Sequence, residues 1–281
     1  MLRPGLSFRE TRAGDTARRQ IDRGTLLPPP VFTAGEAGAW YDPSDLETAF
    51  QDAAGTVSAG EGDPVGRLND ISGNGHDAVQ SVSASRPALQ RDGNGRFYLD
   101  FDGVDDWLEA PGVALGGAAT ATMATAFETR TPVNSAAPIL VWNEFADRAA
   151  DAPLLTIQTS SPTTGDAIQA ILLAIDNQGT GAVPITSPDR AQYTVLIDLP
   201  LAGSGEIALR RNGAAAAAGQ AGKDSGGTGF ASAALAIGAS VGGSNPFHGR
   251  FYGGLLTEGR LTGSDLAAME SWLMNKARVI T

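Results

Sequence analysis

Phe101-Asp-Gly-Val-Asp-Asp-Trp107 is the stretch that most narrows the possible folds, because it separates two apolar, strand-like runs. A similar stretch, Asp70-Ile-Ser-Gly-Asn-Gly-His-Asp77, precedes it. Both place short carboxylate or amide side chains among glycines. Such sequences form tight turns whose side-chain oxygens converge on backbone N–H groups or on a cation. They predict rigid connections between strands, a calcium site, or both.

Outward from these turns the sequence has the pattern of β-strands. Apolar and polar residues alternate, or short apolar runs stand between Gly, Pro, Asn and Asp. The segments recur roughly every 10–15 residues, which is typical of a sandwich or barrel. Asn212-Gly213 predicts a hairpin, because both residues accept positive φ values. The predicted strands are 96–101, 120–129, 139–144, 154–159, 168–176, 193–199, 206–211, 234–238 and 250–256.

One helix is predicted near the end of the chain, with Thr262 or Ser264 as its N-cap. Lys276 and Arg278 suit the negative end of its dipole. The apolar stripe with helical spacing comprises Leu266, Met269, Leu273 and Met274. These elements predict an all-β fold: an antiparallel β-sandwich closed by one C-terminal helix.

Two parts of the chain differ in composition. Residues 1–35 contain six Arg and three acids, and Pro28-Pro29-Pro30 favours an extended segment. We interpret this part as an arm and linker, which is either a tail without fixed structure or a docking peptide for a partner chain. Residues 36–281 form the predicted domain. They carry a net charge of −14, since residues 1–35 are net +3 and the whole chain has a net charge of −11.

Composition also excludes several classes of protein. A chain of 281 residues with 42% apolar residues is long enough for a large core without disulfides, and it has no cysteine. The acidic balance argues against a nucleic-acid partner. No apolar run is long enough to span a membrane, and the N-terminus lacks the apolar core of a signal peptide. We therefore expect synthesis in a bacterial cytoplasm without membrane insertion.

The order of the motifs resembles the concanavalin A-like, laminin G-type jelly roll. After the two turns come Leu235-Ala-Ile-Gly238, Phe247-His-Gly-Arg-Phe-Tyr-Gly253 and Leu261-Thr-Gly-Ser-Asp-Leu266, and Trp40-Tyr-Asp-Pro-Ser-Asp-Leu46 opens the series. The resemblance covers residues 36–278. Similar modules occur in phage tail, fibre and spike proteins, mostly bind polysaccharides, and in some cases bind calcium. The resemblance thus implies an antiparallel jelly roll on a virion or phage-like particle.

Calcium is the first chemistry that the residues allow, since it takes carboxylate and carbonyl oxygens. The expected ligands are Asp70, Asn74, Asp77, Asp102 and Asp105, with Asp106 as a further candidate. Asp70, Ser72 and Asn74 imitate the start of an EF-hand loop, but Ser81 stands where the bidentate Glu belongs. The alternative is a turn network in which these side chains bond backbone N–H groups.

Sugar binding is the second chemistry, because it pairs an aromatic face with directed polar groups. The expected carbohydrate-binding residues are Trp107, Trp142, Asn143, Asn245, His248 and Tyr252. Trp40 and Trp272 are expected to be core residues instead.

Catalysis is not expected. Gly238-Ala-Ser-Val-Gly242 matches a nucleophile-elbow pattern, but Gly243-Ser-Asn-Pro246 cannot begin the helix that must follow it. No carboxylate pair with glycosidase spacing was identified on one strand. We therefore expect a non-enzymatic adhesin that binds cell-surface polysaccharide. Residues 1–35 would bind a virion protein, and several copies would assemble as a homo-oligomer. The alternatives are a structural decoration protein and a polysaccharide depolymerase.

Overall fold

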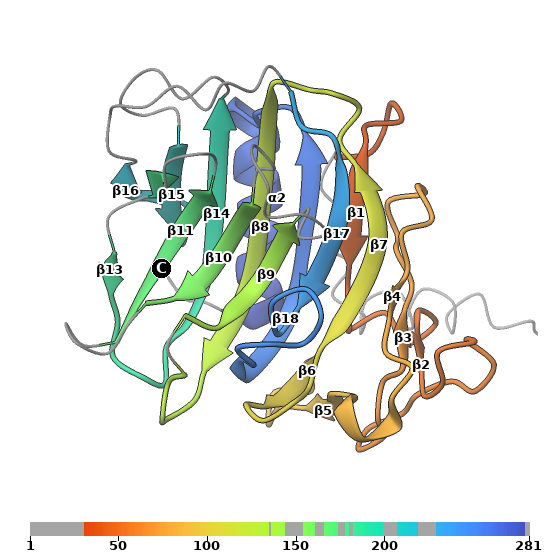
Figure 1. Ribbon diagram of the computed structural model, residues 1–281. Helices are drawn as coiled ribbons and strands as arrows, with labels where there is room; N and C mark the ends of the chain where they lie inside the picture. The colour runs from red at the N-terminus through yellow and green to blue at the C-terminus, as the bar shows by residue number, and fades with distance from the viewer. Residues whose placement is uncertain are drawn as a thin grey trace, which may run out of the picture.

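The computed structural model describes residues 31–134, 136–143, 154–160, 166–173, 178–179, 182–198, 207–218 and 229–278. They form two antiparallel sheets that pack face to face, with one helix behind (Figure 1). The expected all-β sandwich with a C-terminal helix is confirmed. No helix in these ranges is both long and apolar enough to cross a membrane.

Sheet A has the order β16-β15-β14-β8-β18-β6-β5, and β1 pairs with β18. Its central strand β18 is inserted between β8 and β6, although it is the last strand in the chain. The bounds are β1 Gly38–Tyr41, β5 Ala88–Arg91, β6 Phe97–Asp102, β8 Thr120–Thr129, β14 Arg190–Asp198, β15 Ile207–Arg211, β16 Ala214–Ala218 and β18 His248–Glu258.

Sheet B has the order β12-β11-β10-β9-β17-β7-β4-β3-β2, and β13 pairs with β11. Here the late strand β17 is inserted between β9 and β7. The bounds are β2 Ala49–Phe50, β3 Arg67–Leu68, β4 Ala78–Val79, β7 Leu108–Ala114, β9 Pro138–Asn143, β10 Leu154–Thr159, β11 Ala167–Leu173, β12 Gln178–Gly179, β13 Val183–Pro184 and β17 Ser232–Ile237. A 3-10 turn, η1, covers Ser83–Ser85.

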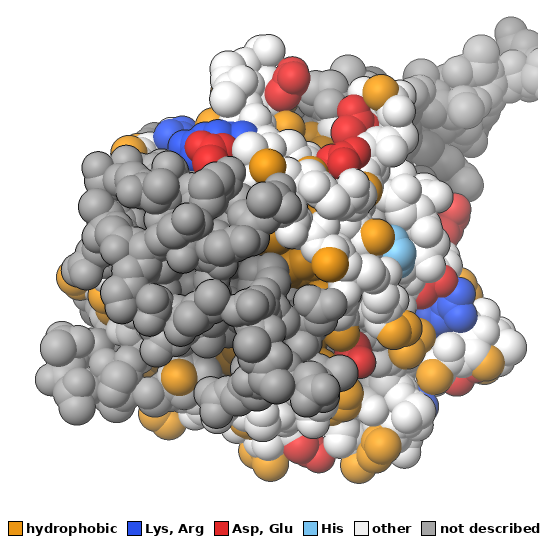
Figure 2. Space-filling model, turned by 45° about the horizontal axis from the view of Figure 1, so that its top comes forward, with side chains coloured by type: hydrophobic (Ala, Val, Ile, Leu, Met, Phe, Trp, Pro, Cys, Tyr) orange, Lys and Arg blue, Asp and Glu red, His pale blue; other side chains and the backbone are white. Residues whose placement is uncertain are grey.

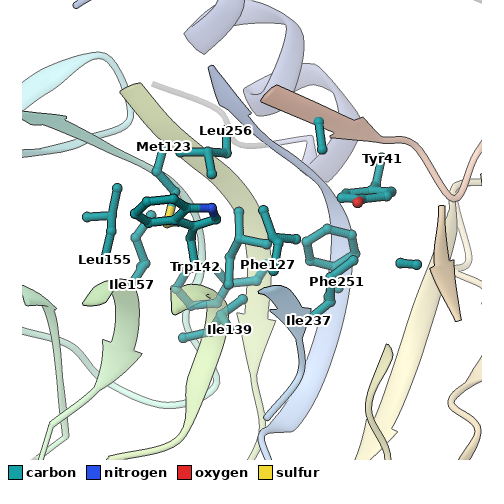
Figure 3. Packing of buried hydrophobic residues seen from close by; sticks show 14 of the residues in the cluster. Tyr41, Met123, Phe127, Ile139, Trp142, Leu155, Ile157, Ile237, Phe251 and Leu256 are labelled. Atoms are coloured by element: carbon teal, nitrogen blue, oxygen red, sulfur yellow. The ribbon is translucent and has the colours of Figure 1, made fainter. Parts of the chain in front are cut away.

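The main core lies between the sheets and is rich in large side chains (Figure 3). Trp142 lies at its centre, fully buried, with Phe230 edge-on to it at 5.7 Å between ring centroids. Its indole N–H donates to the carbonyl of Val113 at 2.9 Å. Phe127 stacks on Tyr193 nearby at 5.2 Å. Truncating one such aromatic side chain typically costs about 3–5 kcal/mol.

Helix α2, Gly263–Ala277, covers the outer face of sheet A. Met269, Trp272 and Leu273 are buried against that face, as their spacing predicts. Trp272 meets Trp40 edge-on at 5.1 Å, so both tryptophans belong to the core as expected. Thr262 is the N-cap residue, but its side chain makes no capping hydrogen bond.

Part of the expected arm belongs to the packed body. Val31 is buried in the cluster under α2, and Phe32 stacks on Trp40 at 6.3 Å. The rest of the arm, residues 1–30, lies outside the described residues.

Charged side chains alternate across four strands on the outer face of sheet A. Arg250 on β18 is paired in register with Asp100 on β6 and Glu128 on β8, and Glu128 faces Arg190 on β14. Arg250 Nη1 lies 3.0 Å from Glu128 Oε1, and Arg190 binds the other oxygen of the same carboxylate. Arg190 also reaches Asp92 at 3.1 Å. We call this row the ion ladder; it ties strands that are distant in sequence.

We expect Glu128→Gln to lower the free energy of unfolding by about 2 kcal/mol or more, because two half-buried arginines lose their shared carboxylate. Urea unfolding measures this change. The matched control is Glu61→Gln: Glu61 pairs with Arg91 at 3.1 Å, both side chains are 49% exposed, and the expected change is about 1 kcal/mol or less. Equal losses in the two variants would contradict a structural role for the ladder.

Candidate functional site

Three connections between the sheets meet at one end of the sandwich. β6, β8 and β17 end there, and β7, β9 and β18 begin there, at the lower end in Figure 1. We call residues 102–107, 130–134 and 238–248 the loop cluster. This part of the molecule contains Asp102, Asp105, Trp107, Asn245 and His248, so the structure brings five of the predicted site residues to one end.

The 102–107 loop is held rigid by its own carboxylates. Asp102 Oδ1 accepts the N–H of Val104 at 2.7 Å, and Asp106 Oδ2 accepts the N–H of Asp102 at 3.0 Å. Asp105 accepts the Ser85 hydroxyl at 2.9 Å, which attaches the loop to η1. Val104, at the tip, is 72% exposed, so the loop presents an apolar group between two acids.

Trp107 is half-buried at the base of this loop. Its backbone N–H donates to the carbonyl of Ser85 at 3.3 Å, and its backbone carbonyl accepts a hydrogen bond from Gln80 Nε2 at 3.3 Å. Gly243 lies against the indole edge: a Cβ there would be 2.7 Å from Trp107 Nε1, and its φ is +84°. Only glycine suits that position. The backbone of Trp107 is thus held by hydrogen bonds, Gly243 packs against its indole, and the residue stays partly exposed to solvent.

His248 and Asn245 belong to the neighbouring loop. His248 pairs in register with Asp102, and its Nδ1 lies 3.1 Å from the Pro132 carbonyl. The imidazole is half-buried, whereas Asn245 is exposed and has a φ of +55°.

Three carboxylates of the 102–107 loop lie close together. One oxygen from each of Asp102, Asp105 and Asp106 lies within 4.8 Å of the others. Burial raises the pKa of Asp106 to about 6; the Asp102 N–H bond opposes this rise, and the charges of Asp102 and Asp105 increase it. Asp102 and Asp105 are exposed, whereas Asp106 is 6% exposed.

The 70–77 turn forms the hydrogen-bond network that was the alternative to a metal site. Asp70 Oδ1 accepts the N–H groups of Trp40 and Ser72, and Oδ2 accepts the Ser72 hydroxyl and His76 N–H. Asp77 accepts the N–H of Asp70 and pairs with Arg67. These oxygens are occupied by donors, and they do not belong to the Asp102 group.

Asn74 also serves the turn rather than a metal. Its Nδ2 donates to the carbonyls of Glu36 at 3.0 Å and Gly38 at 2.9 Å. The side chain therefore links the turn to the segment that leads into β1.

Two predicted sugar-binding aromatics are buried, so those two predictions are wrong. Trp142 lies in the main core (Figure 3), and Tyr252 is fully buried beneath α2 with Arg190 stacked over its ring at 4.9 Å. Neither can offer a face to a ligand. The backbone of Asn143 belongs to β9, but its side chain lies outside the described residues.

The sequence did not predict that Asn134 belongs to the loop cluster. Asn134 joins two loops of the cluster through its side-chain amide, but an isolated Asn in a loop carries no distinguishing signal.

The described part of the face in Figure 2 shows no large patch of hydrophobic or of like-charged side chains. Hydrophobic side chains are scattered over its described part, and the main groups of basic side chains lie beside acidic ones. This pairing agrees with the ion pairs of the structure, such as Arg67–Asp77 and Arg260–Asp198.

We expect Asp106→Asn to raise the free energy of unfolding at pH 7.5 by about 1–2 kcal/mol, since the wild-type carboxylate is ionised there at a cost. The raised pKa means that this cost falls as pH drops through 6 and is gone near pH 4. Urea unfolding in chelator at both pH values checks it. Asp105→Asn, at an exposed position, is the control and should show no such pH dependence. A gain that persists at pH 4 would contradict the explanation.

Calcium stays a prediction, now carried by Asp102, Asp105 and Asp106. Three carboxylates supply part of the six to eight oxygens that the ion takes. Adding calcium at a hundred times its Kd should stabilise the protein by ~2.7 kcal/mol and raise the Tm, and chelator should reverse this. Asp102→Asn with Asp105→Asn should abolish the response, and Asp70→Asn should not. An unchanged wild-type Tm in millimolar calcium would contradict the prediction.

No protein-family model matches the sequence, and no curated protein matches it. Solved structures do match. An arabinofuranosidase in complex with arabinofuranosyl-α-1,2-xylobiose shares a TM-score of 0.58 and 15% identity, over 76% of this chain and 51% of that one. The second match is domain 4 of AbnA, a GH43 extracellular arabinanase from Geobacillus stearothermophilus, in complex with arabinotriose. Its TM-score is 0.53 and its identity 13%, over 84% of this chain and 100% of that one. Trypanosoma rangeli sialidase has a TM-score of 0.54 and 12% identity, over 92% of this chain and 38% of that one.

These likenesses show the fold, and the chain spans about half the length of the arabinofuranosidase. They also correct one expectation. The inference that a jelly-roll chain of this kind is not an enzyme does not hold, because the structures that share its fold are those of carbohydrate-active enzymes. The chain has the β-sandwich fold found in carbohydrate-active proteins.

Proposed function

We propose that the chain recognises a neutral polysaccharide at the loop cluster. The observation that carries this proposal is the half-buried Trp107 at the base of the loop that carries Asp102 and Asp105, with Gly243 of the neighbouring loop against its indole. Domain 4 of AbnA, similar over its whole length and described in complex with arabinotriose, supports it.

The arrangement suits the two surfaces of a sugar ring. The C–H face of the ring is apolar and packs on an indole, while its hydroxyls need directed partners. Asp102 and Asp105 are exposed and can accept hydrogen bonds from hydroxyl groups, and Val104 adds apolar contact at the loop tip.

The charge of the site favours a neutral ligand over an acidic one. Asp102, Asp105 and Asp106 lie together, and Glu109 accepts the N–H of Gly242 at the same end. Like charges at short range are repulsive, and partial burial strengthens the effect. A polymer of uronic or sialic acids would bring further carboxylates to these four.

We expect Trp107→Ala to weaken binding of neutral polysaccharide at least tenfold, about 1.4 kcal/mol, through loss of the stacking surface. Calorimetric titration of the full chain with linear arabinan measures this, with hyaluronate as the acidic comparison. Val57→Ala, which removes a 50% exposed apolar side chain elsewhere, is the control. Equal affinity of Trp107→Ala and wild type, or tighter binding of hyaluronate, would count against the site.

Glycoside hydrolysis is the second candidate, favoured by the acids of the same loop. Retaining glycosidases hold two carboxyl groups about 5–5.5 Å apart, one with a raised pKa as the general acid. Asp106, with its pKa of about 6, lies within 4.8 Å of Asp102 and Asp105 by the closest oxygens.

If the site hydrolyses its ligand, the full chain should release reducing ends from linear arabinan, fastest near pH 6. Asp106→Asn should abolish the release but keep most of the binding, because it removes the acidic proton and little volume. Release that persists in Asp106→Asn would exclude Asp106 as the acid.

A finer role follows from the resemblance of residues 36–278 to phage tail and spike modules. In that role the loop cluster would bind a cell-surface polysaccharide, and residues 1–35 would bind a virion protein. The support is the separate composition of residues 1–35, with six Arg and three acids in an otherwise acidic chain. Several copies in one particle would add avidity to a weak single site.

A further inference from the structure

The two halves of the proposed site come from different connections. Asp102 ends β6, and Asp105 and Trp107 lie between β6 and β7. Asn245 lies between β17 and β18, and His248 begins β18. The pairing of β6 with β18 ends at Asp102 and His248, and no strand pairing among the described residues continues from there into the two loops. Their separation therefore depends on side chains.

Asn134, in the third connection, supplies such a link. Its Nδ2 donates to the carbonyl of Gly103 at 2.9 Å and to the carbonyl of Pro246 at 2.8 Å. Gly103 stands next to Asp102, and Pro246 follows Asn245. One amide group thus holds both loops at a fixed distance from each other.

Asn134 is itself held by the rim of sheet B. Its backbone carbonyl accepts the hydroxyl of Thr159 at 2.5 Å, and the same hydroxyl accepts the N–H of Ala137 at 2.9 Å. Thr159 is 1% exposed at the end of β10, so the anchor is rigid. Asn134 therefore attaches the two loops to the end of sheet B.

The chemistry requires an amide at this position. The amide nitrogen of Asn134 has two N–H donors and binds both carbonyl oxygens, whereas a carboxylate of the same shape has none. Space is also limited: a Cβ at Gly103 would lie 2.7 Å from His248 Cβ and 3.1 Å from Asn134 Nδ2. Glycine at 103 lets the amide and the imidazole approach the loop together.

We propose that Asn134 is a positioning residue, which sets the distance between the Trp107 side and the His248 side of the polysaccharide site. It acts through the loops and does not itself contact the ligand. The proposal rests on the proposed function for its ligand, but the coupling of the two loops can be measured without one.

The test compares Asn134→Asp, Asn134→Gln and wild type, with Asn94→Asp, an exposed hairpin amide, as the matched control. Asn134→Asp should bind linear arabinan at least tenfold more weakly while still unfolding cooperatively. Hydrogen exchange should rise together in 103–107 and 243–248, and not in β8 or β9. Asn134→Gln keeps both donors and should recover at least part of the affinity.

Three results would overturn the proposal. One is wild-type affinity and exchange in Asn134→Asp. Another is faster exchange spread evenly over the sandwich, which would indicate a stability effect alone. The third is faster exchange in only one loop. If wild type binds no arabinan, the ligand assignment fails, while joint loosening of both loops would still support the positioning role.

Discussion

The fold depends on aspartate carboxylates that accept backbone N–H groups where strands end. A chain that leaves a strand gives up its ladder of hydrogen bonds, and an N–H group left unpaired away from water costs about 1–3 kcal/mol. Asp52, Asp70, Asp92 and Asp106 each bind such groups. These four acids therefore have a structural role in the turns.

Two aspartates that accept backbone N–H groups have pKa values shifted in opposite directions. The pKa of Asp52 is lowered, chiefly by the Val57 N–H, so its contribution to stability is present at neutral pH and is lost in acid. The pKa of Asp106 is raised, because burial outweighs the single N–H bond that it accepts. A turn-forming aspartate thereby becomes a group that can hold a proton near pH 6, and this distinguishes the loop cluster from the other turns.

Much of the fold could be predicted from local patterns. The hairpin at Asn212-Gly213 has positive φ values at both residues, as the pair predicts, and α2 follows its apolar stripe. Strand β7 confirms the strand-like run that follows Trp107, although Pro111-Gly112 interrupts its pattern. In the structure these residues form a bulge opposite Ala233 and Leu235, where an extra residue fits in the strand.

The site could be predicted only in part, because burial is decided by distant segments. Trp107 and Trp142 both adjoin apolar strands, and nothing local shows that the second faces the opposite sheet. Tyr252 is covered by a helix that begins after the last strand. The 70–77 turn carries the oxygens of a metal loop, but its donors include Trp40, thirty residues away in sequence. Hydrogen-bond partners this far apart in sequence come together only through the order of the strands in the sheets.

The position of the last two strands constrains how the chain can be made. Strands β17 and β18 occupy the middle of sheet B and sheet A, and the ion ladder passes through β18. A nascent chain emerging from the ribosome therefore exposes two half-sheets with open apolar faces until residues 232–258 are available. Such intermediates fold slowly and expose unpaired edges. Each sheet is therefore completed at its centre, by a strand that is synthesised after its neighbours.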